Sequence, residues 1–137
     1  MISQPILELH QINKSFGHVQ ANKEVSLRIK KGDIHGIVGE NGAGKSTLMS
    51  IVYGYYQADS GYIKINDKKI KIKSPHESIL SGIGMVHQHF MLVENFTVVE
   101  NIILGFEGEF VFGEKLDQAK KSLIKLCEDY SLKIDLD

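Results

Sequence analysis

Apolar and polar residues alternate along short stretches of this chain, and the alternation predicts β-strands. It runs through residues 6–12 and 25–29, and again through 62–65 and 70–72. A half-buried strand shows this period because successive side chains point to opposite faces of the sheet. The last two stretches flank Asn66-Asp67, a turn-forming pair, so we expect them to form a hairpin.

Two further stretches are rich in apolar residues and predict buried strands. They are residues 33–38, which lead into a glycine-rich run, and residues 83–87. Residues 13–21, between the first two alternating stretches, are mostly polar and contain Gly17. This composition predicts a turn or loop that carries one aromatic residue, Phe16.

Helical signals separate and follow these strands. Residues 45–53 predict a helix directly after the glycine-rich run. Ser74-Pro75 begins a short helix that stops by Gly82, with serine as the cap and proline at the first helical position. Thr97 caps a helix over residues 98–104. A last helix over 115–130 places these residues on one stripe: Leu116, Ala119, Leu123, Cys127 and Tyr130.

Strands dominate the first part of the chain and helices the second. We therefore divide it into a strand-rich lobe, residues 1–88, and a helical lobe, residues 89–137. With 137 residues, 42% of them hydrophobic and 24% charged, the chain has the size and composition of one soluble globular domain with a core.

Charge and cysteine content exclude some classes of function. The balance of 16 basic against 17 acidic residues argues against binding of nucleic acid by bulk charge. Cys127 is the only cysteine, so no intrachain disulfide forms and a reducing compartment is expected. No apolar run approaches the roughly 20 residues that span a bilayer. If the protein works at a membrane, a partner is expected to supply the membrane part.

The most informative stretch fits the phosphate-binding pattern G-x-x-x-x-G-K-[ST]. It consists of Gly39, Glu40, Asn41, Gly42, Ala43, Gly44, Lys45, Ser46 and Thr47. Backbone N–H groups of such a loop ring phosphate oxygens, and glycine permits the left-handed turns and the close approach. The following helix adds its N-terminal partial positive charge. We predict that Lys45 reaches the β and γ phosphates and that the Ser46 hydroxyl ligates Mg²⁺; the simpler alternative is a glycine-rich turn beside a lysine.

Three other features have a fixed order around this loop. Phe16 lies in residues 13–17, before the loop, whereas Gln88 ends the strand predicted after it, and residues 96–102 read Phe-Thr-Val-Val-Glu-Asn-Ile. Together with the phosphate loop, this order resembles the ATP-binding subunit of ABC transporters, over essentially the whole chain. The resemblance implies an α/β fold of the P-loop NTPase class, an ABC-type nucleotide-binding domain. It is incomplete, with an antiparallel β lobe, a RecA-like strand–loop–helix unit and the start of the helical subdomain.

The resemblance also assigns roles to individual residues. Phe16 matches the aromatic residue that stacks on the adenine ring of ATP, and Gln88 matches a glutamine that ligates Mg²⁺ and senses the γ-phosphate and the membrane partner. From the residues alone, two simpler interpretations stay open. Phe16 is then a core aromatic residue, and Gln88 is an exposed amide at the end of a strand. His87 and His89 flank Gln88, but a third metal ligand is not evident, so we interpret them as ordinary polar residues.

Among ABC proteins, residues 84–92 and 94–101 look like those of importers for simple sugars and nucleosides, nearer to nucleoside or galactose carriers than to ribose carriers. This resemblance implies ATP and Mg²⁺ as cofactors and a second copy of the ATP-binding domain as partner. It implies membrane permease subunits bound through the helical lobe, and a place on the cytoplasmic face of the cell membrane. The transported substrate is not readable from this chain.

Several elements of an ABC ATPase are not found in the sequence: the Ser-Gly-Gly signature, the Walker B strand with its Asp-Glu pair, and the later histidine. No catalytic set is therefore complete, although Lys45 and Gln88 would contribute to one. We expect the chain to be the N-terminal part of a longer protein, to bind nucleotide without efficient hydrolysis, and to expose strand edges. The alternatives are a small-molecule kinase and a non-catalytic nucleotide-binding module.

Overall fold

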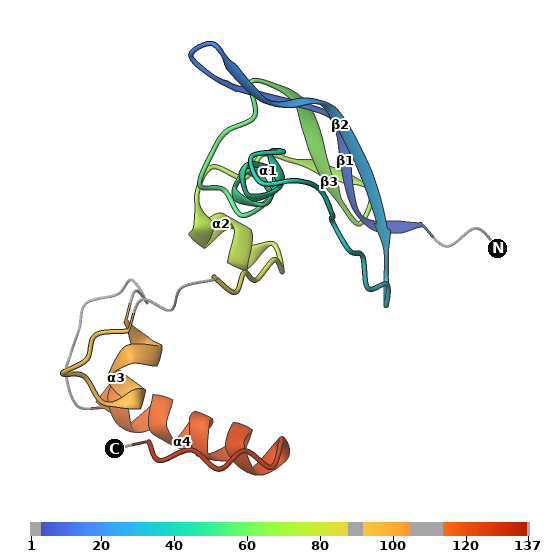
Figure 1. Ribbon diagram of the computed structural model, residues 1–137. Helices are drawn as coiled ribbons and strands as arrows, with labels where there is room; N and C mark the ends of the chain where they lie inside the picture. The colour runs from blue at the N-terminus through green and yellow to red at the C-terminus, as the bar shows by residue number, and fades with distance from the viewer. Residues whose placement is uncertain (1–3, 88–91, 105–113, 137) are drawn as a thin grey trace. The chain divides into compact units, whose positions relative to one another are not determined.

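The computed structural model describes residues 4–87, 92–104 and 114–136, with the side chains of 114–116 excepted. The chain forms two compact units, Met1–Val86 and His87–Asp137. Within the described residues, the first unit holds a sheet with two helices and the second holds two helices (Figure 1). The predicted lobe boundary at residue 88 falls among residues outside the description and stays a prediction.

The first unit is built on one antiparallel sheet with the strand order β2-β1-β3-β4. Its strands are β1 (Pro5–Phe16), β2 (Val19–Lys30), β3 (Ser60–Ile65) and β4 (Lys68–Ile70). The alternating stretches at 6–12, 25–29 and 62–65 are confirmed as strands. The loop predicted over 13–21 is wrong, because β1 continues to Phe16, turns at Gly17 (φ 58°) and re-enters the sheet as β2.

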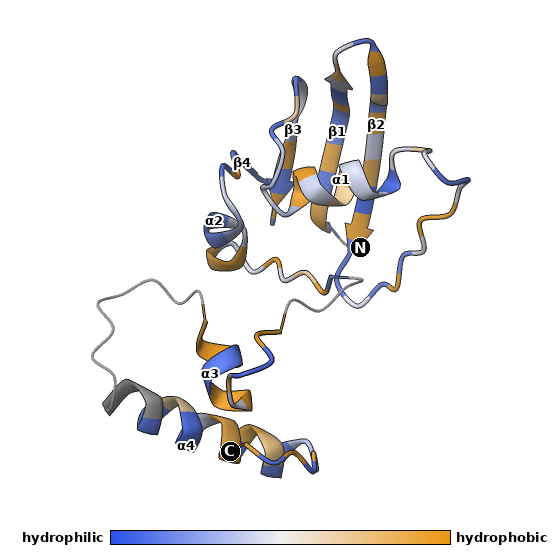
Figure 2. Cartoon of the chain, turned by 60° about the vertical axis from the view of Figure 1, so that its left-hand side comes forward, coloured by the Kyte–Doolittle hydropathy of each residue, from blue (hydrophilic) through white to orange (hydrophobic). Residues whose placement is uncertain are grey.

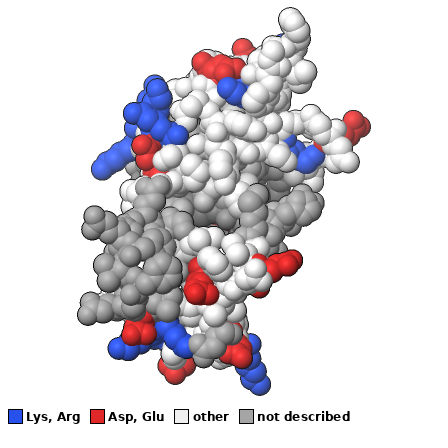
Figure 3. Space-filling model, turned by 90° about the vertical axis from the view of Figure 1, so that its left-hand side faces the viewer, with Lys and Arg blue, Asp and Glu red and all other residues white. Residues whose placement is uncertain are grey.

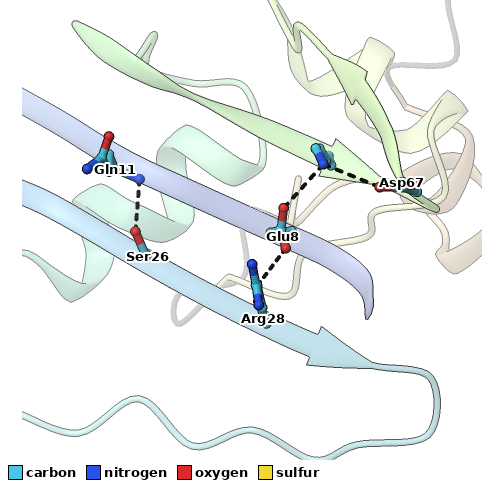
Figure 4. Close-up of polar contacts among 6 residues, drawn as sticks. Glu8, Gln11, Ser26, Arg28 and Asp67 are labelled. Atoms are coloured by element: carbon cyan, nitrogen blue, oxygen red, sulfur yellow. Dashed lines mark hydrogen bonds and ion pairs between the residues drawn. The ribbon is translucent and has the colours of Figure 1, made fainter. Parts of the chain in front are cut away.

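A bulge in β1 explains how this long strand keeps its apolar side chains on one face. Gln11 has φ 46°, and its N–H bonds to the Ser26 hydroxyl at 2.9 Å (Figure 4). The pairing register shifts between Leu9 and Ile12, and both of these side chains are buried. The extra residue of a bulge changes which positions face the core. Beyond the bulge, a simple alternation of period two therefore no longer predicts which side chains of β1 are buried.

Charged residues line up across the outer face of the same sheet. Glu8 is the register partner of Arg28 on β2 and of Lys64 on β3. Its carboxylate contacts Arg28 Nε at 2.6 Å and Lys64 Nζ at 3.6 Å, and Lys64 also reaches Asp67 at 3.3 Å (Figure 4). Glu8 is only 8% exposed, and such a carboxylate is tolerated because cations flank it on both sides.

The core of this unit lies between the sheet and helix α1 (Lys45–Val52), which confirms the helix predicted over 45–53. Figure 2 shows α1 in front of the striped strands. The buried cluster joins strand and helix residues: Leu9, Ile12, Leu48, Ile51, Val52, Ile63 and Ile72. The helix ends at Val52, and the chain turns at Gly54 (φ 87°), where a Cβ would lie 2.6 Å from the Ser74 carbonyl oxygen.

Local sequence signals correctly predicted the turn between β3 and β4 and the start of the next helix. Asn66 (φ 48°) and Asp67 (φ 63°) are both left-handed, as a type I′ hairpin between β3 and β4 requires. The second strand is misplaced in the prediction, because β4 covers Lys68–Ile70 rather than 70–72. Helix α2 (Pro75–Leu80) begins as predicted, with the Ser74 hydroxyl accepting the Glu77 N–H at 3.3 Å.

The two strands predicted to be buried are wrong. Residues 33–38 and 83–87 have no strand structure, and Ile34, Val38 and Val86 are 102%, 93% and 83% exposed. Both segments are largely apolar traces outside the sheet (Figure 2). A strand persists only when its N–H and C=O groups find a ladder partner. The sheet of the described residues consists of β1 to β4, so neither segment is paired with a strand of it.

The second unit consists of α3 (Val98–Ile103) packed against α4 (Glu114–Asp129). Thr97 caps α3 as predicted, and its side chain and that of Glu100 form a reciprocal capping box. Among the described residues of this unit, Val99 and Leu136 are the buried apolar ones. Along the predicted stripe of α4, Ala119, Leu123 and Cys127 are half-buried, whereas Tyr130 is 71% exposed.

Parts of the predicted helical lobe lie outside the described residues. They include Leu116, whose side chain is not described, the predicted stop at Gly105 and the loop over 106–113. Among the helices that the structure describes, none has the length and apolar character needed to cross a bilayer.

Candidate functional site

The glycine-rich run forms a tight loop that leads directly into α1. Gly42 (φ 84°) and Gly44 (φ 85°) both take the left-handed conformation, and the Ala43 N–H donates to the Glu40 carbonyl at 3.2 Å. Gly44 is the N-cap of α1, and no side chain caps this helix. The first-turn N–H groups therefore face the loop without a side-chain acceptor, which is the arrangement that attracts an anion.

Gly44 is held between this loop and strand β2. A Cβ at this position would lie 2.0 Å from the Ala21 carbonyl oxygen and 2.9 Å from Asn22 Nδ2. The Asn22 amide donates to the Gly44 carbonyl oxygen at 3.1 Å. Asn22 is 5% exposed, and its Oδ1 is buried without a hydrogen-bond partner among the described residues. The second glycine is thus required by packing as well as by backbone conformation.

Lys45 folds back over the loop. Its ammonium group donates to the carbonyl oxygens of Gly39 and Glu40, each at 2.6 Å. The positive charge is thereby held above the same short segment whose glycines are left-handed. Ser46 is exposed in the first turn of α1, and Thr47 beside it is half-buried. The cation, the free helix end and a hydroxyl are gathered within one turn of chain.

Phe16 lies at the end of β1 and is not part of the core. Its ring is 43% exposed, and Tyr56 meets it edge-on, with the ring centroids 5.1 Å apart and the planes at 72°. The Lys14 ammonium lies 5.4 Å from the centroid of the same ring. An exposed aromatic ring braced in this way offers a flat surface to a ligand.

Asp59 ties the end of β1 to the segment that follows α1. One carboxylate oxygen accepts from Lys14 Nζ at 2.8 Å and the other from the Ser15 N–H at 2.7 Å. The Asp59 N–H donates to the Asn13 carbonyl at 2.8 Å. The hydrogen bond from Lys14, followed by that from the Ser15 N–H, lowers the pKa of Asp59 below its ordinary value.

The second predicted magnesium ligand is not placed by the structure. Gln88 and His89 lie outside the described residues, and His87 is half-buried. No group of three or more histidine, cysteine or acidic side chains suited to a metal ion occurs within the residues described. Ser46 is therefore the predicted Mg²⁺ ligand whose position is known.

The sequence analysis missed three residues of this region. Asn22 is one polar residue in an alternating strand, which is a weak signal. Tyr56 stands in the aromatic-rich run 53–56 after a helix, and Asp59 precedes a glycine turn. Their partners lie 22, 40 and 45 residues away along the chain, so only the fold brings each pair together.

A family model described as ABC transporter matches residues 22–135. The chain belongs to the ABC transporter family. The match spans the phosphate loop, α1 and both helices of the second unit. The fold class predicted from the resemblance is confirmed, as an incomplete ABC cassette with an antiparallel sheet, although the strand expected at 33–38 is not formed.

Curated relatives of this ABC protein carry names of import ATP-binding proteins. It is 45% identical, over its full length, to "Nucleoside import ATP-binding protein NupA" of Lactococcus lactis, covering 27% of that protein. It is 45% identical over 94% of its length to "Guanosine import ATP-binding protein NupO" of Bacillus subtilis, covering 25%. It is 43% identical over 96% of its length to "Ribose import ATP-binding protein RbsA 2" of Escherichia coli O157:H7, covering 27%. The chain thus spans about a quarter of the length of these relatives.

Solved structures show the same fold. A nucleotide-free ATP-binding cassette from an ABC transporter superposes with a TM-score of 0.77 at 30% identity, over 94% of this chain and 55% of that one. A dimeric cassette in a post-hydrolysis state, bound to ADP and Pi, superposes with a TM-score of 0.64 at 28% identity, over 89% of this chain and 57% of the other.

Proposed function

We propose that this chain is the ATP-binding part of an ABC importer for a nucleoside or a simple sugar. The observation that carries the proposal is the loop itself: two left-handed glycines, a lysine held above them and the uncapped end of α1. The names of the similar proteins, which are nucleoside, guanosine and ribose import ATP-binding proteins, support this class of cargo.

In this proposal the loop binds the triphosphate of ATP. The N–H groups of the loop and of the first turn of α1 donate to phosphate oxygens, and the Lys45 ammonium exchanges its contacts with the Gly39 and Glu40 carbonyls for the β and γ phosphates. The Ser46 hydroxyl and Gln88 would hold Mg²⁺, which neutralises charge on the phosphates. Phe16 would stack on adenine, a contact worth ~1–3 kcal/mol per base.

Binding of nucleotide is a narrower claim than hydrolysis. Transfer of a phosphoryl group to water needs an oriented nucleophile in addition to neutralised charge. Lys45, Ser46 and Gln88 serve the second requirement only. We therefore propose that this chain binds ATP or ADP and hydrolyses ATP slowly or not at all by itself.

Partners complete the proposed function. A second copy of the ATP-binding domain would close over the nucleotide, and the unit of α3 and α4 would contact the permease subunits at the cytoplasmic face of the membrane. Nucleic acid is not a proposed partner, because the chain has 16 basic and 17 acidic residues and so carries no bulk positive charge. On the face drawn in Figure 3, the Lys and Arg side chains that gather at the upper left have Asp or Glu beside them.

Calorimetric titration with Mg-ATP tests the proposal, with Lys45→Ala as the test variant. Loss of a charge-assisted contact to phosphate is expected to weaken binding about tenfold or more. Lys31→Ala is the matched control, because Lys31 is an exposed lysine in the turn after β2. Equal affinities of the two variants would refute the loop's role.

Two assays on the unaltered chain test the alternative functions. Lys45-dependent phosphorylation of added nucleosides or sugars would favour a small-molecule kinase. ATP affinity that is the same with and without Mg²⁺ would favour a non-catalytic nucleotide-binding module.

A further inference from the structure

We infer that Tyr56 is a positioning residue for adenine, the second aromatic of a platform whose first member is Phe16. The inference rests on the proposed function, in which Phe16 stacks on the base. Phe16 is 43% and Tyr56 44% exposed, and their rings are in edge contact at 5.1 Å between centroids. The edge contact from Tyr56 thus supports the half-exposed Phe16 ring that would stack on the base.

The position of Phe16 alone would be poorly fixed. It is the last residue of β1, directly before the turn at Gly17, and its register partner is Val19. Val19 is 66% exposed, so the hairpin end offers little packing to the ring. Within the hairpin, the Lys14 ammonium lies 5.4 Å from the centroid of the Phe16 ring. Tyr56 adds a ring contact from outside the hairpin, with the two centroids 5.1 Å apart.

Tyr56 is itself anchored to the helix of the phosphate loop. The N–H groups of Tyr55 and Tyr56 both donate to the Ser50 carbonyl of α1, at 2.8 and 3.2 Å. The segment then continues to Asp59, whose carboxylate binds Lys14 and the Ser15 N–H, next to Phe16. In Figure 1 this segment runs from α1 to the end of the sheet where β1 and β2 turn.

These contacts link the two ends of the proposed nucleotide site. Lys45 and Ser46 lie in the first turn of α1, and the last turns of the same helix hold Tyr56. The spacing between the phosphate loop and the aromatic platform is therefore set by α1 together with residues 53–59. A ligand with a base at one end and a triphosphate at the other benefits from such a fixed spacing, because less conformational entropy is lost on binding.

The test compares two probes, Mg-ATP and inorganic tripolyphosphate with Mg²⁺. Tripolyphosphate engages the loop but has no base. Tyr56→Ala should weaken ATP binding about two- to tenfold, the range that one aromatic pair supports. Tripolyphosphate affinity should change less than about twofold in the same variant, and Tyr56→Phe, which keeps the ring, should bind ATP as the unaltered chain does.

Tyr55→Ala is the matched control. Tyr55 adjoins Tyr56, is 54% exposed, and its ring packs against Tyr53 at 5.4 Å. Its loss should leave the preference for ATP over tripolyphosphate unchanged. If Tyr56→Ala weakens both probes equally, Tyr56 supports α1 or the loop and the inference is wrong. It is also wrong if ATP affinity does not change.

Phe16→Ala separates failure of the inference from failure of the proposed function. If Phe16→Ala does not weaken ATP binding, the adenine part of the proposed function fails, and the inference with it. If Phe16→Ala weakens ATP and Tyr56→Ala does not, only the inference fails. In the double variant, Tyr56→Ala should add little to Phe16→Ala, because a residue that acts through Phe16 has nothing left to position.

Discussion

Strand β1 and the segment 33–38 have similar apolar residues and opposite fates. β1 pairs with β2 on one side and β3 on the other, and its Ile12 is 0% exposed. Residues 33–38 form no strand pairing with any described residue, and Ile34 is 102% exposed. The difference shows that apolar side chains favour burial in general, whereas a strand also needs a neighbour for its backbone.

The largest expected effect is a difference in stability between two isoleucine-to-alanine variants, one in β1 and one in the segment 33–38. Ile12→Ala should lower the free energy of unfolding by about 2–5 kcal/mol, because it leaves a cavity beneath α1. Ile34→Ala should change it by less than about 0.5 kcal/mol, since the side chain is already in water. Urea denaturation of both variants measures the difference. A similar loss for Ile34→Ala would mean that the segment is packed after all.

The next largest effect is expected in the phosphate loop, between the exposed segment 33–38 and the packed helix α1. Gly44→Ala should cost about 2–4 kcal/mol, because a Cβ meets the Ala21 carbonyl in a left-handed backbone. Gly42→Ala should cost about 1–2 kcal/mol, because Gly42 has the left-handed backbone but open space around it. Thermal and urea unfolding compare the two. Equal costs would show that β2 does not constrain the loop.

A smaller effect is expected at the start of α2, where the cap residue lies next to the helix in the sequence. Ser74→Ala removes the hydroxyl that accepts the Glu77 N–H at the start of α2, and should cost about 1 kcal/mol. Ser74→Asp keeps an acceptor at this position and should restore most of that loss. Urea denaturation gives both values, and a neutral Ser74→Ala would show that packing, rather than the cap, holds α2.

The smallest effect is a pH dependence at the end of β1. The hydrogen bonds from Lys14 and the Ser15 N–H lower the pKa of Asp59 below 3.8. A carboxyl with a depressed folded-state pKa stabilises the fold fully above its unfolded value, and this contribution is lost as the pH falls through the folded-state pKa. Stability should therefore rise with pH near and below 3.8 and then level off.

Asp59→Asn is the control for that slope. It keeps an acceptor oxygen but removes the titrating group, so the part of the slope due to Asp59 should disappear. Urea denaturation between pH 2.5 and 6 compares the two proteins. An unchanged slope in Asp59→Asn would assign the acid sensitivity to other carboxylates.

Local patterns predicted the elements whose cause is local. The caps at Ser74 and Thr97 and the left-handed pair Asn66-Asp67 lie within a few residues of the elements they determine, and all were found in the structure. The prediction failed where the cause lies elsewhere in the chain. The bulge at Gln11 depends on Ser26, and the hairpin through 13–21 depends on pairing between Phe16 and Val19.

The sequence by itself determined the phosphate loop, because glycine, lysine and hydroxyl at fixed spacing act within one turn of chain. It also indicated the family, through the order of Phe16, the loop and Gln88. Tertiary structure decided which apolar stretches became strands, because a ladder needs a partner that no single stretch contains. It also brought Asn22 to Gly44, and Tyr56 and Asp59 to the end of β1. These contacts join residues tens of positions apart, and their geometry exists only once the sheet and α1 are packed.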